Sequence, residues 1–217
     1  MTVFGFSDLA LVGGLTPPQA SLKQKFVAWI EASNPATDRV TGNAITGTAS
    51  VANVTHGSLT KAWTNGTLAG MSIPELTDLT IWFTGHRTGT GDGGTTWVVG
   101  NPAEFGLTTF NGVFWTARIM GSSNLATVPS PNGSVISYAA RRAASATLVE
   151  GFLNGNSHGF AEPNFSNGAA ITSRNLTSNL TSIAFMSTFA VSNQVLTLEE
   201  IQYLHNGGNF RLWADVS

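Results

Sequence analysis

Residues 189–208 read FAVSNQVLTLEEIQYLHNGG, and this stretch decides the fold prediction. Thr197 is a good helix N-cap, because its hydroxyl can accept a hydrogen bond from a backbone N–H of the first turn. Glu200 can reach back to the N–H of Thr197, which completes a capping box. Gly207 lies in an Asn-Gly-Gly run that tolerates a positive φ and ends the helix. The spacing therefore predicts a short helix over 197–205.

A helix of this length is marginal in water unless it buries one face. Leu198, Ile201 and Leu204 recur at the spacing of one helix face, so we expect them to dock the helix on a larger structure. The preceding segment, residues 182–192, alternates large apolar residues with smaller ones. This period of two predicts a strand with at least one buried face.

Other segments show the same alternation or short apolar runs. In residues 79–84 every second side chain is large and apolar, and Trp82 faces the opposite way. Asn154-Gly155 is a strong type I′ hairpin signal, and further Asn-Gly pairs, including Asn65-Gly66, predict turns between short strands. Residues 22–32 also fit a helix face. The predicted strands cover residues 26–31, 51–55, 79–84, 97–99, 113–120, 135–140, 146–153 and 182–192.

A strand that runs into a small capped helix ending in Asn-Gly-Gly resembles the C-terminal part of laminin-G-like modules. These modules belong to the concanavalin A-like lectin and glucanase jelly rolls. PELTDLTIWFTGH at 74–86 and ATLVEGFLNGNSHG at 146–159 also resemble strands of such modules. The resemblance implies an all-β fold, a two-sheet antiparallel jelly-roll sandwich with one short C-terminal α-helix. We assign residues 21–217 to this domain.

The composition limits the partners of the chain. Charged residues make up only 10% of the 217 residues and the net charge is −2, against about 25% charged residues in an ordinary soluble domain. Such a chain has no electrostatic footprint for nucleic acid or for an anionic membrane. It has no run of about 18 apolar residues that could span a bilayer. Cysteine is absent, which excludes thiolate metal sites.

Residues 1–20 precede the first predicted core strand and are unusually apolar. They contain no basic n-region, so we predict no signal peptide. One interpretation is a frayed terminus. The other is an assembly arm that packs on a second copy of the chain or on a capsid protein, through Phe4, Phe6, Leu9, Leu11 and Val12.

No catalytic residues are predicted. Retaining glycoside hydrolysis needs two carboxylates close together, and the Glu-x-Asp-x-x-Glu spacing of jelly-roll glucanases is missing. The adjacent pair Glu199-Glu200 is explained by helix capping. The histidines are scattered without a metal-binding spacing, and we interpret each as a surface or turn residue; they are His56, His86, His158 and His205.

Two features suggest a ligand or interface site. The glycine-rich segment 85–94 is most simply a loop between strands, and the alternative is a rim loop that touches a ligand through His86 and Asp92. Calcium is the one cofactor considered, but it takes six or more oxygen ligands and Asp92 has no acidic neighbour. Trp82 and Phe114 face away from the main apolar stripes, so they could stack on sugar rings or anchor an interface. The alternative is that both sheet faces are covered.

These observations lead to three functional hypotheses, in order of preference. The first is a non-enzymatic virion accessory protein, such as a phage capsid decoration protein on the virion surface, assembled as a homo-oligomer with capsid or other virion proteins. The second is a carbohydrate-binding module that recognises a host-surface glycan. The third is an enzyme. The low charge, the absence of cysteine and the apolar arm favour the first.

Overall fold

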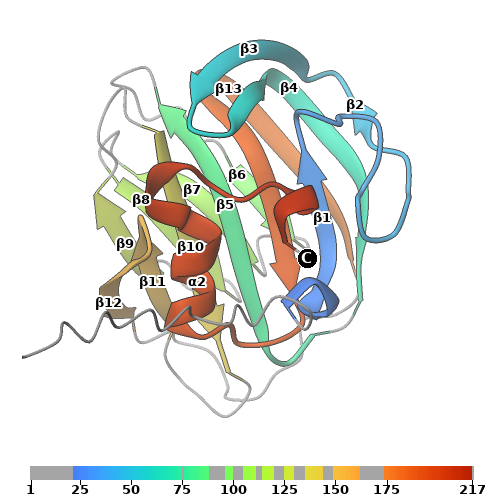
Figure 1. The fold of residues 1–217 in the computed structure, drawn as a ribbon. Helices are drawn as coiled ribbons and strands as arrows, with labels where there is room; N and C mark the ends of the chain where they lie inside the picture. The colour runs from blue at the N-terminus through green and yellow to red at the C-terminus, as the bar shows by residue number, and fades with distance from the viewer. Residues whose placement is uncertain are drawn as a thin grey trace, which may run out of the picture.

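The computed structural model describes residues 22–74, 76–87, 96–99, 105–110, 114–119, 125–129, 135–143, 149–161 and 174–216. These residues form an all-β sandwich with one short α-helix, as predicted from the sequence (Figure 1). The arm predicted over residues 1–20 lies outside the described residues. No helix in the described part of the chain is long and apolar enough to cross a membrane.

The strands include every segment predicted from the sequence and several that were missed. Residues 26–31 are a strand rather than a helix. The strands are β1 (Phe26–Glu31), β2 (Thr46–Gly47), β3 (Ser50–His56), β4 (Leu59–Ile73), β5 (Leu79–Arg87), β6 (Thr96–Val99), β7 (Phe105–Phe110), β8 (Phe114–Ile119), β9 (Leu125–Pro129), β10 (Val135–Arg142), β11 (Val149–Leu153), β12 (Asn156–Ala161) and β13 (Arg174–Ser192).

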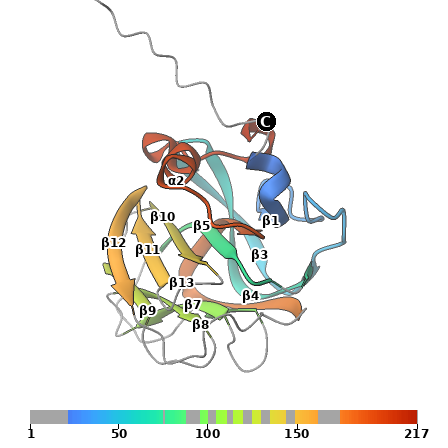
Figure 2. The ribbon, with the colours of Figure 1, turned by 90° about the horizontal axis from the view of Figure 1, so that it is seen from below.

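All described strand pairs are antiparallel and belong to one hydrogen-bonded network. The main path runs β12-β11-β10-β5-β13-β6-β7-β8-β9. β1 and β4 also pair with β13, and β2 and β3 pair with β4. The edge strand β9 contacts β11 and β12, which closes one side of the sandwich (Figure 2).

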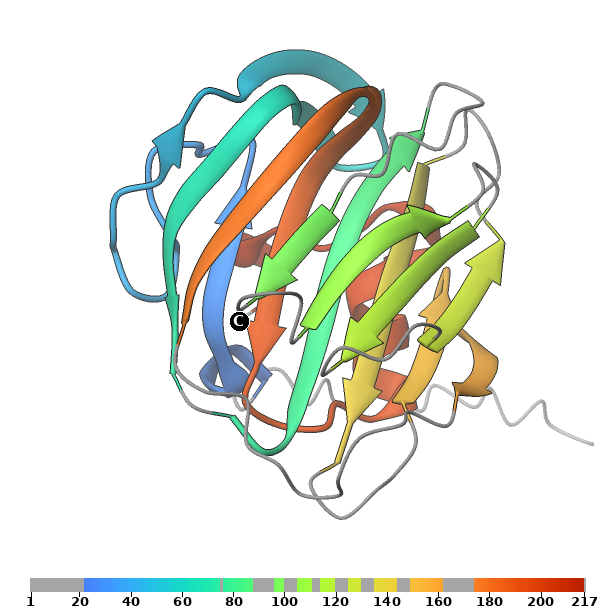
Figure 3. The same cartoon turned by 180° about the vertical axis from the view of Figure 1, so that it is seen from behind.

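The two long strands β4 and β13 connect the layers of the sandwich. The second half of β13 pairs with β1 and β5, whereas its first half pairs with β6. β4 follows β13 through both halves, and the two strands fold over together (Figure 3). Each strand therefore contributes to both layers.

The bend in β4 corrects one sequence-based prediction. Asn65-Gly66 was expected to form a turn between separate strands, but it lies inside β4. Both residues have positive φ, 38° for Asn65 and 122° for Gly66. The pair bends a strand whose hydrogen bonds to β13 continue on either side, because a positive φ can redirect a strand without ending it.

The core has two parts, which lie on opposite faces of strand β5. Ile81 and Phe83 point between the layers, where they join Met71 and other apolar side chains. Trp82 points to the opposite face, where it joins Leu204 and the rest of the second cluster under the helix. Both faces of β5 are therefore buried.

The helix α2 (Leu198–His205) forms as predicted at its start. The N–H of Glu200 donates to Thr197 Oγ1 at 3.2 Å, and the N–H of Thr197 donates to Glu200 Oε2 at 2.9 Å. Ile201 and Leu204 are buried against the sheet, as expected. The prediction for Leu198 was wrong, because this side chain is 37% exposed.

Leu196 explains the difference at Leu198. It lies just before the N-cap, is fully buried, and belongs to the same cluster as Ile201 and Leu204. Leu196 therefore supplies the apolar contact at this end of the helix, and the first helical turn points Leu198 away from the sheet.

Candidate functional site

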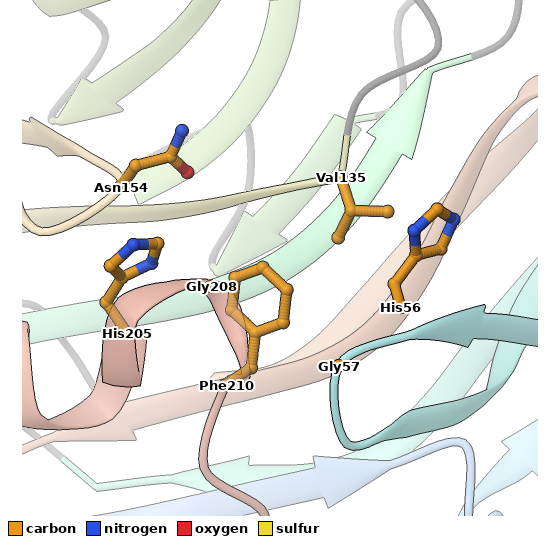
Figure 4. A pocket seen from close by; sticks show the side chains of 7 residues that line it. All are labelled: His56, Gly57, Val135, Asn154, His205, Gly208 and Phe210. Atoms are coloured by element: carbon orange, nitrogen blue, oxygen red, sulfur yellow. The ribbon is translucent and has the colours of Figure 1, made fainter.

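Three chain segments meet at one end of the sandwich and form a pocket that is open to solvent. They are the turn between β3 and β4, the turn between β11 and β12, and the chain that leaves α2, with the start of β10 between them. The pocket has a volume of about 450 Å³. It is lined by His56, Gly57, Val135, Asn154, His205, Gly208 and Phe210 (Figure 4).

The β3–β4 turn is docked tightly on the segment after the helix. The N–H of Ser58 donates to the carbonyl oxygen of Asn209 at 3.0 Å, and the Ser58 hydroxyl donates to the carbonyl oxygen of Phe210. A Cβ atom on Gly57 would lie 2.6 Å from the Cα atom of Asn209. Only glycine allows this approach, so the pocket wall is fixed by backbone contacts.

The chain that follows α2 turns back and lines the pocket. Asn206 caps the helix in the left-handed region, and Gly207 follows with a φ of 62°, which confirms the predicted helix stop. The N–H of Phe210 then donates to the carbonyl oxygen of His205 at 3.1 Å. Phe210 has a φ of 47° and is only 3% exposed. A bulky residue with positive φ is uncommon, and here the packing of its ring holds it in place.

The β11–β12 turn forms the third wall. Asn154 and Gly155 have φ values of 51° and 75°, which confirms the predicted type I′ hairpin. The N–H of Asn154 donates to the carbonyl oxygen of Ser137 at 2.9 Å. In return, the N–H of Ser137 donates to Asn154 Oδ1 at 3.0 Å. The turn is therefore locked onto β10.

His205 connects the helix to the same strand. Its Nδ1 atom lies 2.9 Å from the hydroxyl oxygen of Ser137. The ring of Phe210 meets it edge-on, with 5.6 Å between ring centroids. Burial lowers the pKa of the imidazole below its ordinary value of 6.5, because the charged form loses hydration. His205 is therefore a half-buried pocket residue at the turn that ends α2.

The Ser137–His205 contact does not form a catalytic dyad. Ser137 is fully buried and does not line the pocket, so no substrate can reach its hydroxyl. Among the described residues that line the pocket there is no Asp or Glu. The contact orients the imidazole of His205 beside the pocket.

Of the four ligand or interface residues predicted from the sequence, the structure describes the side chain of Trp82. Trp82 is fully buried under α2, so it cannot stack on a ligand, and the alternative of covered sheet faces is correct for this residue. Asp92 and the side chains of His86 and Phe114 lie outside the described residues.

The calcium hypothesis stays a prediction, because Asp92 is not described. Within the described ranges, no three or more His, Cys, Asp or Glu side chains gather closely enough to hold a metal ion.

Comparison with known proteins gives similarity at the level of fold. No protein-family model matches the chain. No curated protein matches it either. A structure titled for the cell entry of botulinum neurotoxin type C, dependent upon interaction with two ganglioside molecules, superposes with a TM-score of 0.66 at 12% identity, covering 86% of this chain and 52% of that one.

Sialidase structures from Trypanosoma rangeli are also similar. The complex with 2,3-difluorosialic acid has a TM-score of 0.60 at 11% identity, and covers 84% of this chain and 32% of that chain. The complex with sialic acid has a TM-score of 0.58 at 11% identity, with 84% and 33% covered. The present chain thus spans about a third to a half of these proteins. At this identity the similarity establishes a β-sandwich with jelly-roll-like architecture.

Proposed function

We propose that this protein is a carbohydrate-binding β-sandwich module and that the pocket between the three turns is its binding site. The pocket carries the proposal. Its size falls within the range of small-molecule sites, about 300–1,000 Å³. Its walls combine imidazole and amide groups with the apolar side chain of Val135, beside the nearly buried ring of Phe210. Sugars present the matching combination of hydroxyl groups and apolar ring faces.

The structural similarities support the same role. The sialidase complexes contain sialic acid or a derivative of it, and the toxin structure is described by its interaction with gangliosides. A carbohydrate-binding role therefore fits the fold better than the virion accessory role that was preferred from composition. The finer resemblance to laminin-G-like and concanavalin A-like modules is consistent with this proposal.

We propose binding without hydrolysis. Most glycosidases use a pair of carboxyl groups beside the bound sugar, and the described residues that line the pocket include no Asp or Glu. The polar groups of these described residues can hold a sugar, and none of them is a carboxyl group.

A glycan array with the full chain tests the proposal. Val135→Phe should fill the pocket and reduce binding at least about tenfold. Val51→Phe is the matched control, because Val51 is an exposed valine on β3 and does not line the pocket. Circular dichroism checks that both variants are folded. Absence of binding to any glycan would refute the proposed function, and equal binding by wild type and Val135→Phe would refute the site.

A further inference from the structure

The hydrogen bond between Ser137 and His205 determines which proton the imidazole carries. Ser137 is fully buried, and its hydroxyl has His205 Nδ1 as its partner in the described part of the chain. A buried hydroxyl proton needs an acceptor. If Nδ1 were protonated, the hydroxyl would lose this acceptor. The Ser137 hydroxyl therefore donates to Nδ1, and the neutral ring carries its proton on Nε2.

This arrangement gives the pocket a fixed hydrogen-bond donor. The ring lies beside the pocket, and no partner of Nε2 is found among the described residues. Asn154 stands next to His205 at the same side of the pocket (Figure 4). Its Oδ1 atom already accepts from the N–H of Ser137, so the unused capacity of the Asn154 side chain is also mainly that of a donor. A ligand must bring an acceptor to this side.

Apolar surface lies directly beside the donors. Figure 4 shows Phe210 and Val135 between His205 on one side of the pocket and His56 on the other. The aromatic ring and the isopropyl group cannot hydrogen-bond. A ligand group that reaches from the donors onto this surface must therefore pair an acceptor with a small apolar end.

The charge of the pocket determines whether a charged carboxylate or a neutral carbonyl oxygen is the better hydrogen-bond acceptor there. Among the described residues that line it there is no Lys, Arg, Asp or Glu, and the lowered pKa of His205 keeps that ring neutral near pH 7. A carboxylate would lose hydration there without gaining an opposite charge, which is costly. A carbonyl oxygen loses much less and still accepts the hydrogen bond.

We infer that the pocket recognises the acetamido group of an N-acetylated amino sugar, whose carbonyl oxygen accepts from Nε2–H of His205 and whose methyl group packs on Val135. This inference rests on the proposed function and specifies its ligand class. It names a chemical group, so it can fail while carbohydrate binding itself holds.

Isothermal titration at about pH 7.5 with three monosaccharides tests it. N-acetylglucosamine should bind at least about tenfold more tightly than glucose, because a well-placed carbonyl and methyl group together contribute this much discrimination. Glucuronic acid, which carries a carboxylate, should bind no more tightly than glucose.

Two histidine variants provide the residue-level test. His205→Phe keeps a ring and removes the donor, so it should weaken binding of N-acetylglucosamine by about three- to tenfold, which is more than it weakens binding of glucose. His158→Phe is the matched control, because His158 is exposed on β12 and does not line the pocket. This variant should bind as the wild type does.

The outcomes separate the two claims. Equal affinity for glucose and N-acetylglucosamine, or tighter binding of glucuronic acid, would overturn the acetamido assignment and leave carbohydrate binding intact. Selectivity for N-acetylglucosamine that His205→Phe does not reduce would overturn the role of His205. Failure of all three sugars here and of every glycan on the array would overturn the proposed function itself.

Discussion

At the residue scale, the hydrogen bonds of Ser137 hold two walls of the pocket in place. Its backbone pairs with Asn154 and its hydroxyl pairs with His205. One buried residue therefore holds two walls of the pocket, one from a β-turn and one from a helix end. A change at either partner alters how the other is held.

Acidification should destabilise the protein through His205. The folded-state pKa lies below 6.5, so the unfolded chain binds the proton more readily. The contribution of this residue to the free energy of unfolding is complete above pH 6.5. It falls as the pH drops through 6.5 and levels off below the folded-state pKa. Urea unfolding at a series of pH values measures this loss.

A glutamine variant isolates the effect. His205→Gln removes the titrating group and keeps a side chain that can accept from Ser137, so unfolding free energy should depend less on pH between about 5 and 7.5. His158→Gln changes an exposed histidine and should keep the wild-type dependence. An unaltered pH dependence in His205→Gln would show that His205 is not the responsible group.

The pocket could be predicted from the sequence only in part. Asn154 and Gly207 carry turn signals that the structure confirms, but neither signal says that the two turns meet. His56 and His205 looked like isolated polar residues, because they are far apart in the chain and obey no motif spacing. That both line one pocket depends on how the β3–β4 turn docks on Asn209, which is a tertiary contact without a local sequence pattern.

At the scale of elements, α2 is stabilised by a few buried side chains. Leu204→Ala should destabilise the protein by about 2–5 kcal/mol, because Leu204 is fully buried between the helix and the sheet. Leu198→Ala is the matched control on the same helix and should cost less than about 0.5 kcal/mol, since Leu198 is partly exposed. Guanidinium unfolding measures both, and similar losses would contradict the orientation of the helix.

The bend of β4 depends on Gly66. A Cβ atom there would lie 2.7 Å from backbone atoms of Thr48 and Ala49, and the φ of 122° disfavours any other residue. Gly66→Ala should therefore lower the melting temperature clearly. Gly42→Ala is the control, since Gly42 also has positive φ but nothing lies within 4 Å of its added Cβ; it should cost only about 1 kcal/mol. Equal effects would contradict the close approach.

The strands were predictable where side chains alternate, and β5 is the best case. Its two apolar stripes correspond to two buried faces. β4 was missed because its 15 residues include Asn65-Gly66 and Gly70, and such residues are typical of turns that end a strand. Pairing with β13 keeps these residues in a strand, so tertiary hydrogen bonds override the local turn preference.

At the scale of the whole molecule, the described residues close a sandwich without residues 1–21. The assembly arm therefore stays a prediction. Deleting residues 1–16 should leave the melting temperature nearly unchanged and reduce self-association or attachment to a partner, because several apolar side chains would otherwise remain in water. Calorimetry and light scattering after size exclusion measure the two effects. Unfolding of the deletion variant would show instead that the segment belongs to the domain.

The shared strand β13 also determines when the molecule can form during its synthesis. β1 leaves the ribosome early, but its partner residues Thr188–Ser192 are made much later. β4, β5 and β6 also pair with β13, so these pairs cannot form until β13 has been synthesised. A nascent chain that ends before residue 174 would expose unpaired edges on several strands at once, and such edges favour aggregation. Once β13 has been synthesised, these strand edges can pair within the chain, and the nascent chain is then less prone to aggregate with other chains.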